Sequence, residues 1–549
     1  MGELATPARS ATLDRLERES FDCAVIGGGI SGAGVAREAS LRGLSVALLE
    51  VEDFASGTSS RSTKLIHGGL RYLAMGDVAL VRTTALERKQ IFRLAPHLAE
   101  RRWMVVPVQS YAALLKMRAG ITVYEKLGAV ERPDLHQNWG VSEIEREEPA
   151  LDASRYKHAC AYREYLTDDA HLVLANLRSA AGLGAAVLNH ARVEAIVRDR
   201  ERAAGVEAVC RLSGRRVRVR ARCVINAAGP WVEAVRRLES PAAPPLLHLS
   251  KGVHVVVTAE RLPVRNLLFL NTLDRRSIFV IRRGPCVVIG TTDTSWAQGA
   301  GVWPEITRED VEYLLEPPGR YLRGEKLGAH DVIGAWAGLR PLIAQPGKKP
   351  SEISRRDEVL VGPAGVVTMA GGKLTGYRPL ARETIERAAE VGSLKITPAA
   401  KQDPPLPGGD FDGDLAALES ALVRETGVSA VAAARLVRLH GTEASEVARA
   451  GTQELVPGVL ASEIEFAVRK EGAATLEDLL YRRLRTSLYA GSAREAAVAP
   501  AAERMARLLG WDAARTQAEM SGVRAQLLAD LSFRDEASSA GVARAVGVK

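Results

Sequence analysis

The sequence is poor in the residues and patterns that mark several large protein classes. Its 549 residues include only five cysteines, which are far apart and form no Cys-x-x-Cys pair: Cys23, Cys160, Cys210, Cys223 and Cys286. This distribution argues against a disulfide framework and a cysteine-based zinc site, and we assign no metal site from the sequence. No helix-turn-helix, zinc-finger or aromatic RNA-binding signature is present, so we expect no nucleic-acid partner.

Long apolar runs are also missing. The first 20 residues mix charged residues with single apolar ones, so they lack the continuous apolar centre of a signal peptide. No later run approaches the roughly 18 apolar residues needed to cross a bilayer. We therefore expect the protein to be made and kept on the cytoplasmic side of the cell membrane.

Length and composition indicate a globular protein of two or three domains. The chain is too long for one hydrophobic core, and 46% of its residues are hydrophobic and 26% charged. Its 74 Lys and Arg against 66 Asp and Glu give a net charge of +8. This modest basic bias suits an anionic substrate, an anionic cofactor or an acidic membrane surface.

Apolar and glycine patterns indicate how the chain is organised. A short apolar run at 21–26, a small-residue helix ending near Gly43 and a second apolar run at 46–49 predict a β-α-β unit. Residues 402–409 are rich in proline and glycine, which neither a helix nor a central strand tolerates. Alanine- and leucine-rich segments at helical spacing follow, at 412–425, 428–440, 460–472, 475–490 and 494–510.

These patterns predict an α/β protein with a Rossmann-like nucleotide-binding domain, interleaved with an antiparallel-sheet substrate domain and followed by a helical domain. We expect an N-terminal lead at 1–20, the two interleaved domains over 21–400 with the substrate parts at roughly 78–165 and 245–345, a linker at 401–410, the C-terminal helical domain at 411–525, and a disordered tail at 535–549.

A G-x-G-x-x-G motif stands between the first strand and its helix. Gly27 allows a tight turn, Gly29 lets the backbone approach a pyrophosphate, and Gly32 permits close helix-to-strand packing. The N-terminus of the helix offers N–H groups to the phosphates. Glu50, at the end of the second strand, is placed to bind a ribose hydroxyl and argues against NADP. This unit predicts a dinucleotide but leaves NAD and FAD open.

Further blocks of sequence resemble the FAD-dependent glycerol-3-phosphate dehydrogenase family, whose nucleotide-binding fold is of the glycine-oxidase and glutathione-reductase type. The resemblance runs from about residue 20 to 520 and rests on blocks in a fixed order: SSRSTKLIHGGLRY at 59–72, TDDAHLVLAN at 167–176, VINAAGPW at 224–231, SKGVH at 250–254, IGTTD at 289–293, GLRP at 338–341 and GGKLTGYR at 371–378. It implies FAD as the cofactor, bound non-covalently.

The resemblance also implies which residues contact FAD. The segment at 59–72 would run along the pyrophosphate toward the flavin, the turn at 226–231 would close on the nucleotide, and the loop at 371–375 would lie against the flavin. The cofactor-binding residues expected beyond the glycine motif and Glu50 are Ser59, Ser60, Lys64, His67, Val193, Gly229, Gly372 and Leu374.

The implied reaction is oxidation of sn-glycerol 3-phosphate to dihydroxyacetone phosphate by hydride transfer to flavin N5. A phosphorylated substrate needs cations for its phosphate. Arg340 and Lys373 meet this need, because both stand in sequence bounded by glycine or proline, which we interpret as loops at a sheet edge. Arg71, Tyr72 and Thr375 would complete the pocket.

The reaction also needs a base for the hydroxyl proton. His254 is our first candidate and His67 the second, since a histidine near neutral pKa can take that proton. His254 opens an apolar stretch, so a structural histidine is a nearly equal alternative. His67 has an alternative role as a hydrogen-bond partner of the flavin.

The electron acceptor stays open. The resembled dehydrogenases pass electrons to a membrane quinone from the cytoplasmic face, which predicts peripheral membrane association, with 111–121 as a candidate contact and a packed helix as its alternative. A glycerophosphate oxidase that uses oxygen is the nearest other enzyme. Amino-acid oxidase, 2-hydroxyacid dehydrogenase and a non-enzymatic flavin-binding protein follow. A homodimer is allowed but not required.

Overall fold

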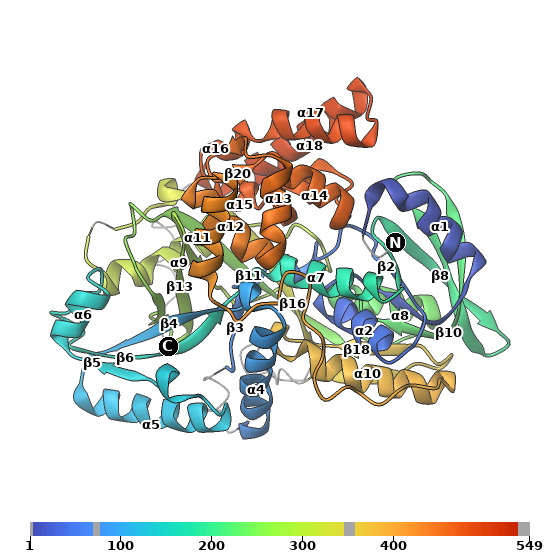
Figure 1. The fold of residues 1–549 in the computed structure, drawn as a ribbon. Coiled ribbons are helices and arrows are strands. Elements are labelled where there is room, and N and C mark those ends of the chain that lie inside the picture. Colours follow the sequence, from blue (N-terminus) through green and yellow to red (C-terminus); the bar gives the residue numbers. More distant parts are fainter. Residues whose placement is uncertain (1–3, 70–76, 325, 345–356, 536–549) are drawn as a thin grey trace.

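A computed structural model describes residues 4–69, 77–324, 326–344 and 357–535, which form two large sheets and a cluster of C-terminal helices (Figure 1). Arg71, Tyr72 and all of the expected tail except Asp535 lie outside these residues. No helix in the described ranges is long and apolar enough to cross a membrane.

The first sheet contains the glycine motif. Its central strand β1 (Ser20–Ile26) runs parallel to β2 (Val46–Leu49) on one side and to β10 (Arg216–Asn226) on the other. The parallel strands β7 (Ala186–Leu188) and β18 (Val367–Ala370) extend it outward. Elements cover both of its faces, which explains why the sequence of β2 is continuously apolar rather than alternating.

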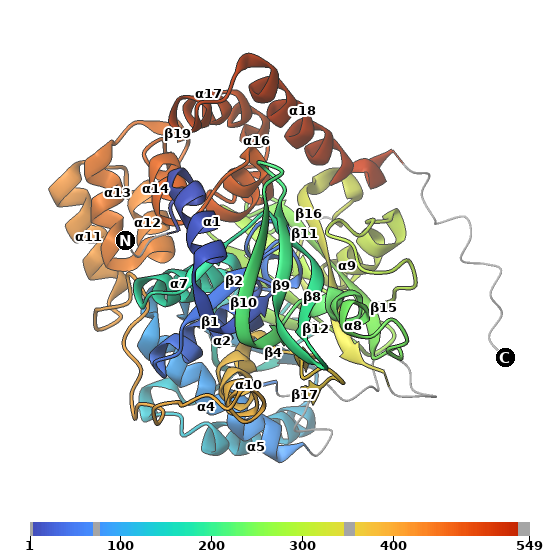
Figure 2. The same ribbon diagram turned by 90° about the vertical axis from the view of Figure 1, so that its right-hand side faces the viewer.

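Helices α2 (Ile30–Leu41), α7 (Asp169–Gly182) and α10 (Tyr377–Gly392) pack together on one face of the first sheet. The N-terminal lead forms helix α1 (Arg9–Arg18) on the other face. Figure 2 turns that second face toward the viewer, with α1 beside β10. Three antiparallel strands complete the sheet: β8 (Ala191–Asp199), β9 (Arg202–Cys210) and, at the edge away from α1, β17 (Glu358–Val361).

Within the described residues, the second sheet has ten strands, and its neighbouring pairs are antiparallel except β4 with β12. Its strands are β3 (Leu65–Ile66), β4 (Glu100–Val108), β5 (Gln137–Trp139), β6 (His158–Leu166), β11 (Leu247–Thr258), β12 (Leu267–Asn271), β13 (Ser277–Arg283), β14 (Cys286–Gly290), β15 (Thr294–Ser295) and β16 (Val332–Ile343). The remaining helices before the C-terminal cluster are α4 (Val78–Leu94), α5 (Tyr111–Leu127), α6 (Val141–Glu147), α8 (Val232–Glu239) and α9 (Arg308–Tyr321).

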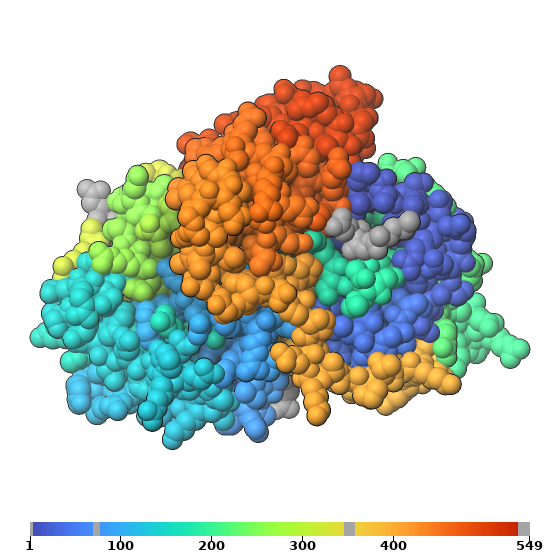
Figure 3. All heavy atoms as spheres, in the orientation of Figure 1, coloured from blue at the N-terminus to red at the C-terminus, as the bar shows by residue number. Residues whose placement is uncertain are grey.

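The C-terminal helices lie over the upper side of the molecule, between the two sheet regions in the orientation of Figure 3. They are α11 (Leu415–Thr426), α12 (Ala430–His440), α13 (Ala444–Ala450), α14 (Glu463–Lys470), α15 (Thr486–Tyr489), α16 (Ala493–Ala496), α17 (Val498–Leu509) and α18 (Ala513–Ala529), with the small hairpin β19 (Glu454–Val456) and β20 (Val459–Leu460). The sequence patterns did not predict α13 and α18.

The continuous helical segment predicted at 475–490 is wrong. The chain forms a π-helical turn at Asp478–Arg483, and Arg485 then takes the left-handed conformation with φ of 60° before α15 begins. The buried guanidinium of Arg485 donates to Asp168 at 2.7 Å and to Asp169 at 2.6 Å. These long-range ion pairs, invisible in local periodicity, accompany the break in the helix.

Candidate active site

Two adjoining cavities connect the two sheets. The glycine-turn cavity, of about 370 Å³, is lined by the G-x-G-x-x-G turn, and the His254 cavity, of about 270 Å³, is lined by strands of the second sheet. The two cavities share wall residues: Thr58, Ser62, Pro341, Gly371, Gly372 and Leu374. An extended ligand can therefore reach from the first sheet to His254.

The glycines of the turn leave no room for side chains. Gly27 has φ of 113°, a conformation that favours glycine. A Cβ on Gly32 would lie 1.9 Å from the carbonyl oxygen of Gly27, so the helix can approach the turn only because Gly32 lacks one. A Cβ on Gly29 would lie 3.1 Å from Ser59 Oγ. The turn thus presents bare backbone to the cavity.

Glu50 and Ser59 bind the backbone around this turn. Glu50 Oε2 accepts a hydrogen bond from the Gly28 N–H at 2.6 Å, and Oε1 accepts one from the Glu52 N–H at 2.9 Å. Burial raises the pKa of the Glu50 carboxyl group, and these two bonds act in the opposite direction. Ser59 Oγ accepts from the Ile30 N–H at 2.9 Å, at the start of α2.

Six further predicted cofactor residues fall into two groups. Val193, Gly229, Gly372 and Leu374 line the glycine-turn cavity. Ser60 and Lys64 line neither cavity. Lys64 Nζ is buried and donates to the Ser60 carbonyl oxygen and to Asp169 Oδ1, both at 2.8 Å. Burial lowers the pKa of Lys64 to about 7. These two residues support the cavity wall from behind.

His254 lies in the middle of β11, whereas the sequence placed it at the start of a strand. Its Nε2 is 2.9 Å from Thr63 Oγ1, and its ring stacks on Trp336 with centroids 5.2 Å apart. Nδ1 is buried and has no hydrogen-bond partner within the described ranges. Burial, with Arg340 and Lys64 nearby, holds the pKa of His254 well below its usual value, so the ring is neutral.

His67 lines the same cavity, 6.0 Å from the Phe279 ring between centroids. Its backbone N–H donates to Thr375 Oγ1 at 3.2 Å, and Thr375 Oγ1 donates to the His67 carbonyl oxygen at 3.1 Å. Thr375 therefore joins the segment before residue 70 to the loop at 371–375. Both segments border the site.

Arg340 lies on strand β16, so its predicted position in a loop is wrong. Strand β16 pairs only with β11 among the described strands, and such an edge strand tolerates Pro341. Arg340 donates to Thr291 Oγ1 at 2.9 Å and to Asp293 Oδ1 at 3.3 Å. Lys373, in contrast, lies in the loop after β18 and lines the same cavity.

Sequence patterns missed Arg276, which also lines the His254 cavity. It stands just before β13 and donates to the Asp293 carbonyl oxygen at 2.8 Å. The turn that carries it has no motif, and one arginine in a chain with 74 basic residues gives no signal. Phe269 and Phe279 add an apolar wall. Arg276, Arg340 and Lys373 thus line one cavity, together with the carboxylates of Glu164, Asp293 and Asp357.

The comparisons with known proteins agree with this geometry. Residues 22–378 match the model of the FAD dependent oxidoreductase family, and residues 401–516 match the C-terminal domain of alpha-glycerophosphate oxidase. The chain is 36% identical over 499 residues to the aerobic glycerol-3-phosphate dehydrogenase of Staphylococcus haemolyticus, covering 87% of this chain and 89% of that protein. The protein belongs to the FAD-dependent glycerol-3-phosphate dehydrogenase family.

Other members of the family extend the similarity. The aerobic glycerol-3-phosphate dehydrogenase of Bacillus subtilis is 33% identical over 493 residues, with 86% of this chain and 89% of that protein covered. The crystal structure of the Bacillus halodurans glycerol-3-phosphate dehydrogenase complexed with FAD superimposes with a TM-score of 0.80 at 29% identity, over 97% of this chain and 100% of that one. The predicted fold class and the predicted cofactor, FAD, are confirmed.

Proposed function

We propose that this dehydrogenase-family protein oxidises sn-glycerol 3-phosphate to dihydroxyacetone phosphate and delivers the electrons to a membrane quinone. The observation that carries the proposal is one cavity that combines Arg276, Arg340 and Lys373 with a neutral histidine and adjoins the glycine-turn cavity. FAD, when bound, supplies the acceptor for the hydride and its two electrons. The remaining chemistry belongs to side chains of the protein.

The three cations would bind the substrate phosphate. Arg340 is held by Thr291 and Asp293, so its guanidinium is oriented before a ligand arrives. An oriented guanidinium can donate two parallel hydrogen bonds to a phosphate, whereas Lys373 acts as a point charge. Binding through the phosphate would fix the distance from the cations to the carbon that loses hydride.

The neutral His254 would take the proton of the substrate's C2 hydroxyl. Its Nε2 contacts Thr63 Oγ1, a hydroxyl that also lines the cavity and through which a proton can pass. The low pKa weakens His254 as a base but keeps it unprotonated and ready to accept. His67 is the alternative base, since it lines the same cavity.

An anaerobic titration tests this function directly. Glycerol 3-phosphate should bleach the oxidised flavin band of the purified holoenzyme, while glycerol, lactate and glycine should not. Glycine or lactate as the only effective reductant would replace the proposal with an amino-acid oxidase or a 2-hydroxyacid dehydrogenase. A flavin that no candidate reduces would favour a non-enzymatic flavoprotein.

The acceptor is tested by reoxidation of the reduced flavin. The match of 401–516 to the alpha-glycerophosphate oxidase C-terminal domain favours oxygen as a second candidate. Stopped-flow mixing of the reduced enzyme with a soluble quinone analogue or with oxygen separates the two. Fast reaction with the quinone and slow reaction with oxygen is expected, and the reverse would make the protein an oxidase.

A quinone acceptor would require the protein to rest on the cytoplasmic face of the membrane. The candidate contact at 111–121 belongs to α5, which exposes Tyr111 and Leu115 at 61% and 46%. Leu115→Asp should reduce the fraction of protein that floats with anionic liposomes, and high salt should reduce this fraction further. Leu528→Asp, at a site 75% exposed on α18, is the matched control. Equal flotation of both variants would remove α5 from the proposal.

A further inference from the structure

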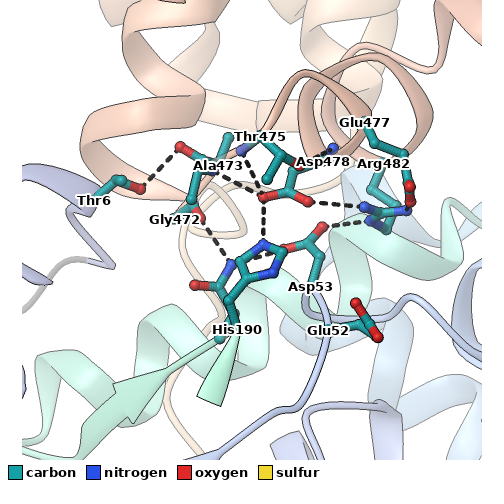
Figure 4. A network of polar contacts seen from close by, with 12 residues as sticks. Thr6, Glu52, Asp53, His190, Gly472, Ala473, Thr475, Glu477, Asp478 and Arg482 are labelled. Carbon is teal, nitrogen blue, oxygen red and sulfur yellow. Dashed lines mark hydrogen bonds and ion pairs between the residues drawn. The ribbon is translucent and has the colours of Figure 1, made fainter. Parts of the chain in front are cut away.

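Two buried clusters of histidine and carboxylate join the C-terminal helices to the first sheet. The first, drawn in Figure 4, contains Asp53, His190 and Asp478. His190 Nε2 is 2.9 Å from Asp478 Oδ2, and the guanidiniums of Arg482 and Arg483 both donate to Asp53. Its carboxylates thus already have positively charged partners. This cluster is a closed ion-pair network.

The second cluster, in contrast, has buried polar atoms that lack hydrogen-bond partners among the described residues. It contains His171 in the first turn of α7, His440 at the end of α12 and Glu471 directly after α14, with side chains 2%, 4% and 3% exposed. Glu471 Oε1 lies 4.0 Å from His171 Nε2 and 3.9 Å from His440 Nδ1, too far for hydrogen bonds. Within the described part of the chain, His171 Nε2 and Glu471 Oε2 have no hydrogen-bond partner at all.

Buried polar atoms without a hydrogen-bond partner are uncommon in proteins, and several of them facing one point indicate a bound ion or water molecule. One ligand atom from each of the three residues lies within 4.8 Å of the others. We propose that His171, His440 and Glu471 bind one divalent transition-metal ion of the zinc class. Two imidazole nitrogens and one carboxylate oxygen form a common protein donor set for zinc.

The spacing of the ligand atoms is close to what such an ion needs. Bonds of 2.0–2.1 Å in a tetrahedral site place neighbouring ligand atoms about 3.4 Å apart. The observed 3.9 and 4.0 Å would therefore contract by about half an ångström on binding, which small side-chain rotations supply. A water molecule can complete the coordination.

The surroundings orient His171 as a metal-binding histidine requires. Asp168 Oδ1 lies 3.0 Å from His171 Nδ1, which directs the proton to that nitrogen and leaves Nε2 to face Glu471. Arg485 in turn fixes Asp168 through a 2.7 Å ion pair. The bound ion would cross-link α7 of the FAD-binding domain to the C-terminal helices. No sequence motif predicts this site, because its three residues are far apart in the chain.

Metal analysis of the holoenzyme tests the proposal. Protein purified without chelator should contain close to one zinc per chain, and after chelation it should bind cobalt with the visible absorption of tetrahedral Co²⁺, read at wavelengths beyond the flavin bands. Glu471→Gln, nearly identical in shape, should lower the affinity for cobalt at least tenfold, and His440→Ala should abolish binding. Zinc should raise the Tm of the chelated wild type but not of Glu471→Gln.

Two controls separate this site from other histidines. His190→Asn disrupts the closed network at the same interface, and His330→Asn changes a side chain that is 82% exposed. Both should keep one cobalt per chain. Equal loss of metal in His190→Asn, or no cobalt uptake by the chelated wild type, would overturn the proposal and leave the cluster as a polar contact. Should His440→Ala fail to fold, Glu471→Gln alone decides.

Discussion

The two ends of the candidate site are built in opposite ways. The nucleotide end is made of backbone: the turn at Gly27, Gly29 and Gly32 lines the cavity without side chains, and Glu50 and Ser59 accept hydrogen bonds from its N–H groups. The end that we propose for the substrate phosphate is made of side chains, and Arg340 and Lys373 come to it from separate segments of the chain. We therefore expect the shape of the backbone to hold a ligand at the nucleotide end, and positive charge to hold it at the other end.

This difference decides how each end should respond to mutation. A site formed by glycine backbone loses its ligand when a substitution adds a side chain, because no rotamer of that side chain restores the space. A pocket formed by several cations loses affinity in steps, since each cation contributes only part of the binding free energy. Substitutions at the two ends should therefore separate cofactor retention from substrate affinity.

The largest effect is expected at the nucleotide end. Gly29→Val should give colourless protein, because its side chain would fill the space where the pyrophosphate approaches and would press on Ser59. Flavin content per chain, from the absorption spectrum, is the measurement. Gly120→Ala on α5, where a Cβ meets nothing within 4 Å, is the control and should stay yellow. Full flavin content in Gly29→Val would contradict the role of the turn.

The next effect concerns the base. His254→Asn should lower kcat about 10²- to 10⁴-fold, the usual contribution of a positioned base, and should change the KM for glycerol 3-phosphate little. His67→Asn is the comparison, because both residues line the same cavity. Steady-state kinetics with a quinone analogue distinguishes them. Unchanged kcat in His254→Asn together with a large loss in His67→Asn would transfer the base to His67.

A smaller effect is expected from the cations. Arg340→Ala or Lys373→Ala should raise the KM for glycerol 3-phosphate about 10- to 100-fold, since a hydrogen bond to a charged group contributes about 1.5–3 kcal/mol. FAD content should survive the Arg340 change better, because the loop of Lys373 also borders the glycine-turn cavity. Arg340→Lys tests whether bidentate geometry matters. Unaltered affinity in both alanine variants would place the phosphate elsewhere.

The same contrast explains what the sequence could predict. Gly27 to Glu50 form one contiguous β-α-β unit whose spacing encodes its geometry, so its position was predictable from the residues alone. Arg276 and the strand position of Arg340 depend on how β11 pairs with β16 and where a hairpin turns, and no local pattern records either. The break at Arg485 likewise accompanies ion pairs to Asp168 and Asp169 at the start of α7, which local periodicity does not record.

The smallest expected difference between the two ends is in how low pH changes their contributions to stability. Burial raises the pKa of Glu50 but lowers that of His254. A raised carboxyl pKa contributes stability that is present at low pH and is lost as pH rises through the folded-state value. A lowered histidine pKa does the reverse: its contribution is full above the unfolded value of about 6.5 and is lost as pH falls below it.

Between pH 7.5 and 5.5, His254 should therefore contribute to an acid-induced loss of stability, as should the buried His97 and His440, whose pKa values are also lowered. A buried ring that stays neutral loses about 1.4 kcal/mol of stability for each pH unit below about 6.5. In a chain of this size that corresponds to a fall in Tm of only about 1 to 2 °C, by extrapolation from smaller domains. His254→Asn should show a smaller acid-induced fall in Tm than the wild type, measured by scanning calorimetry of the holoenzyme at both pH values. His330→Asn, whose side chain is 82% exposed, should behave as wild type. An identical pH dependence in His254→Asn would mean that its ring titrates normally, and the substrate end would then lose its buried neutral base.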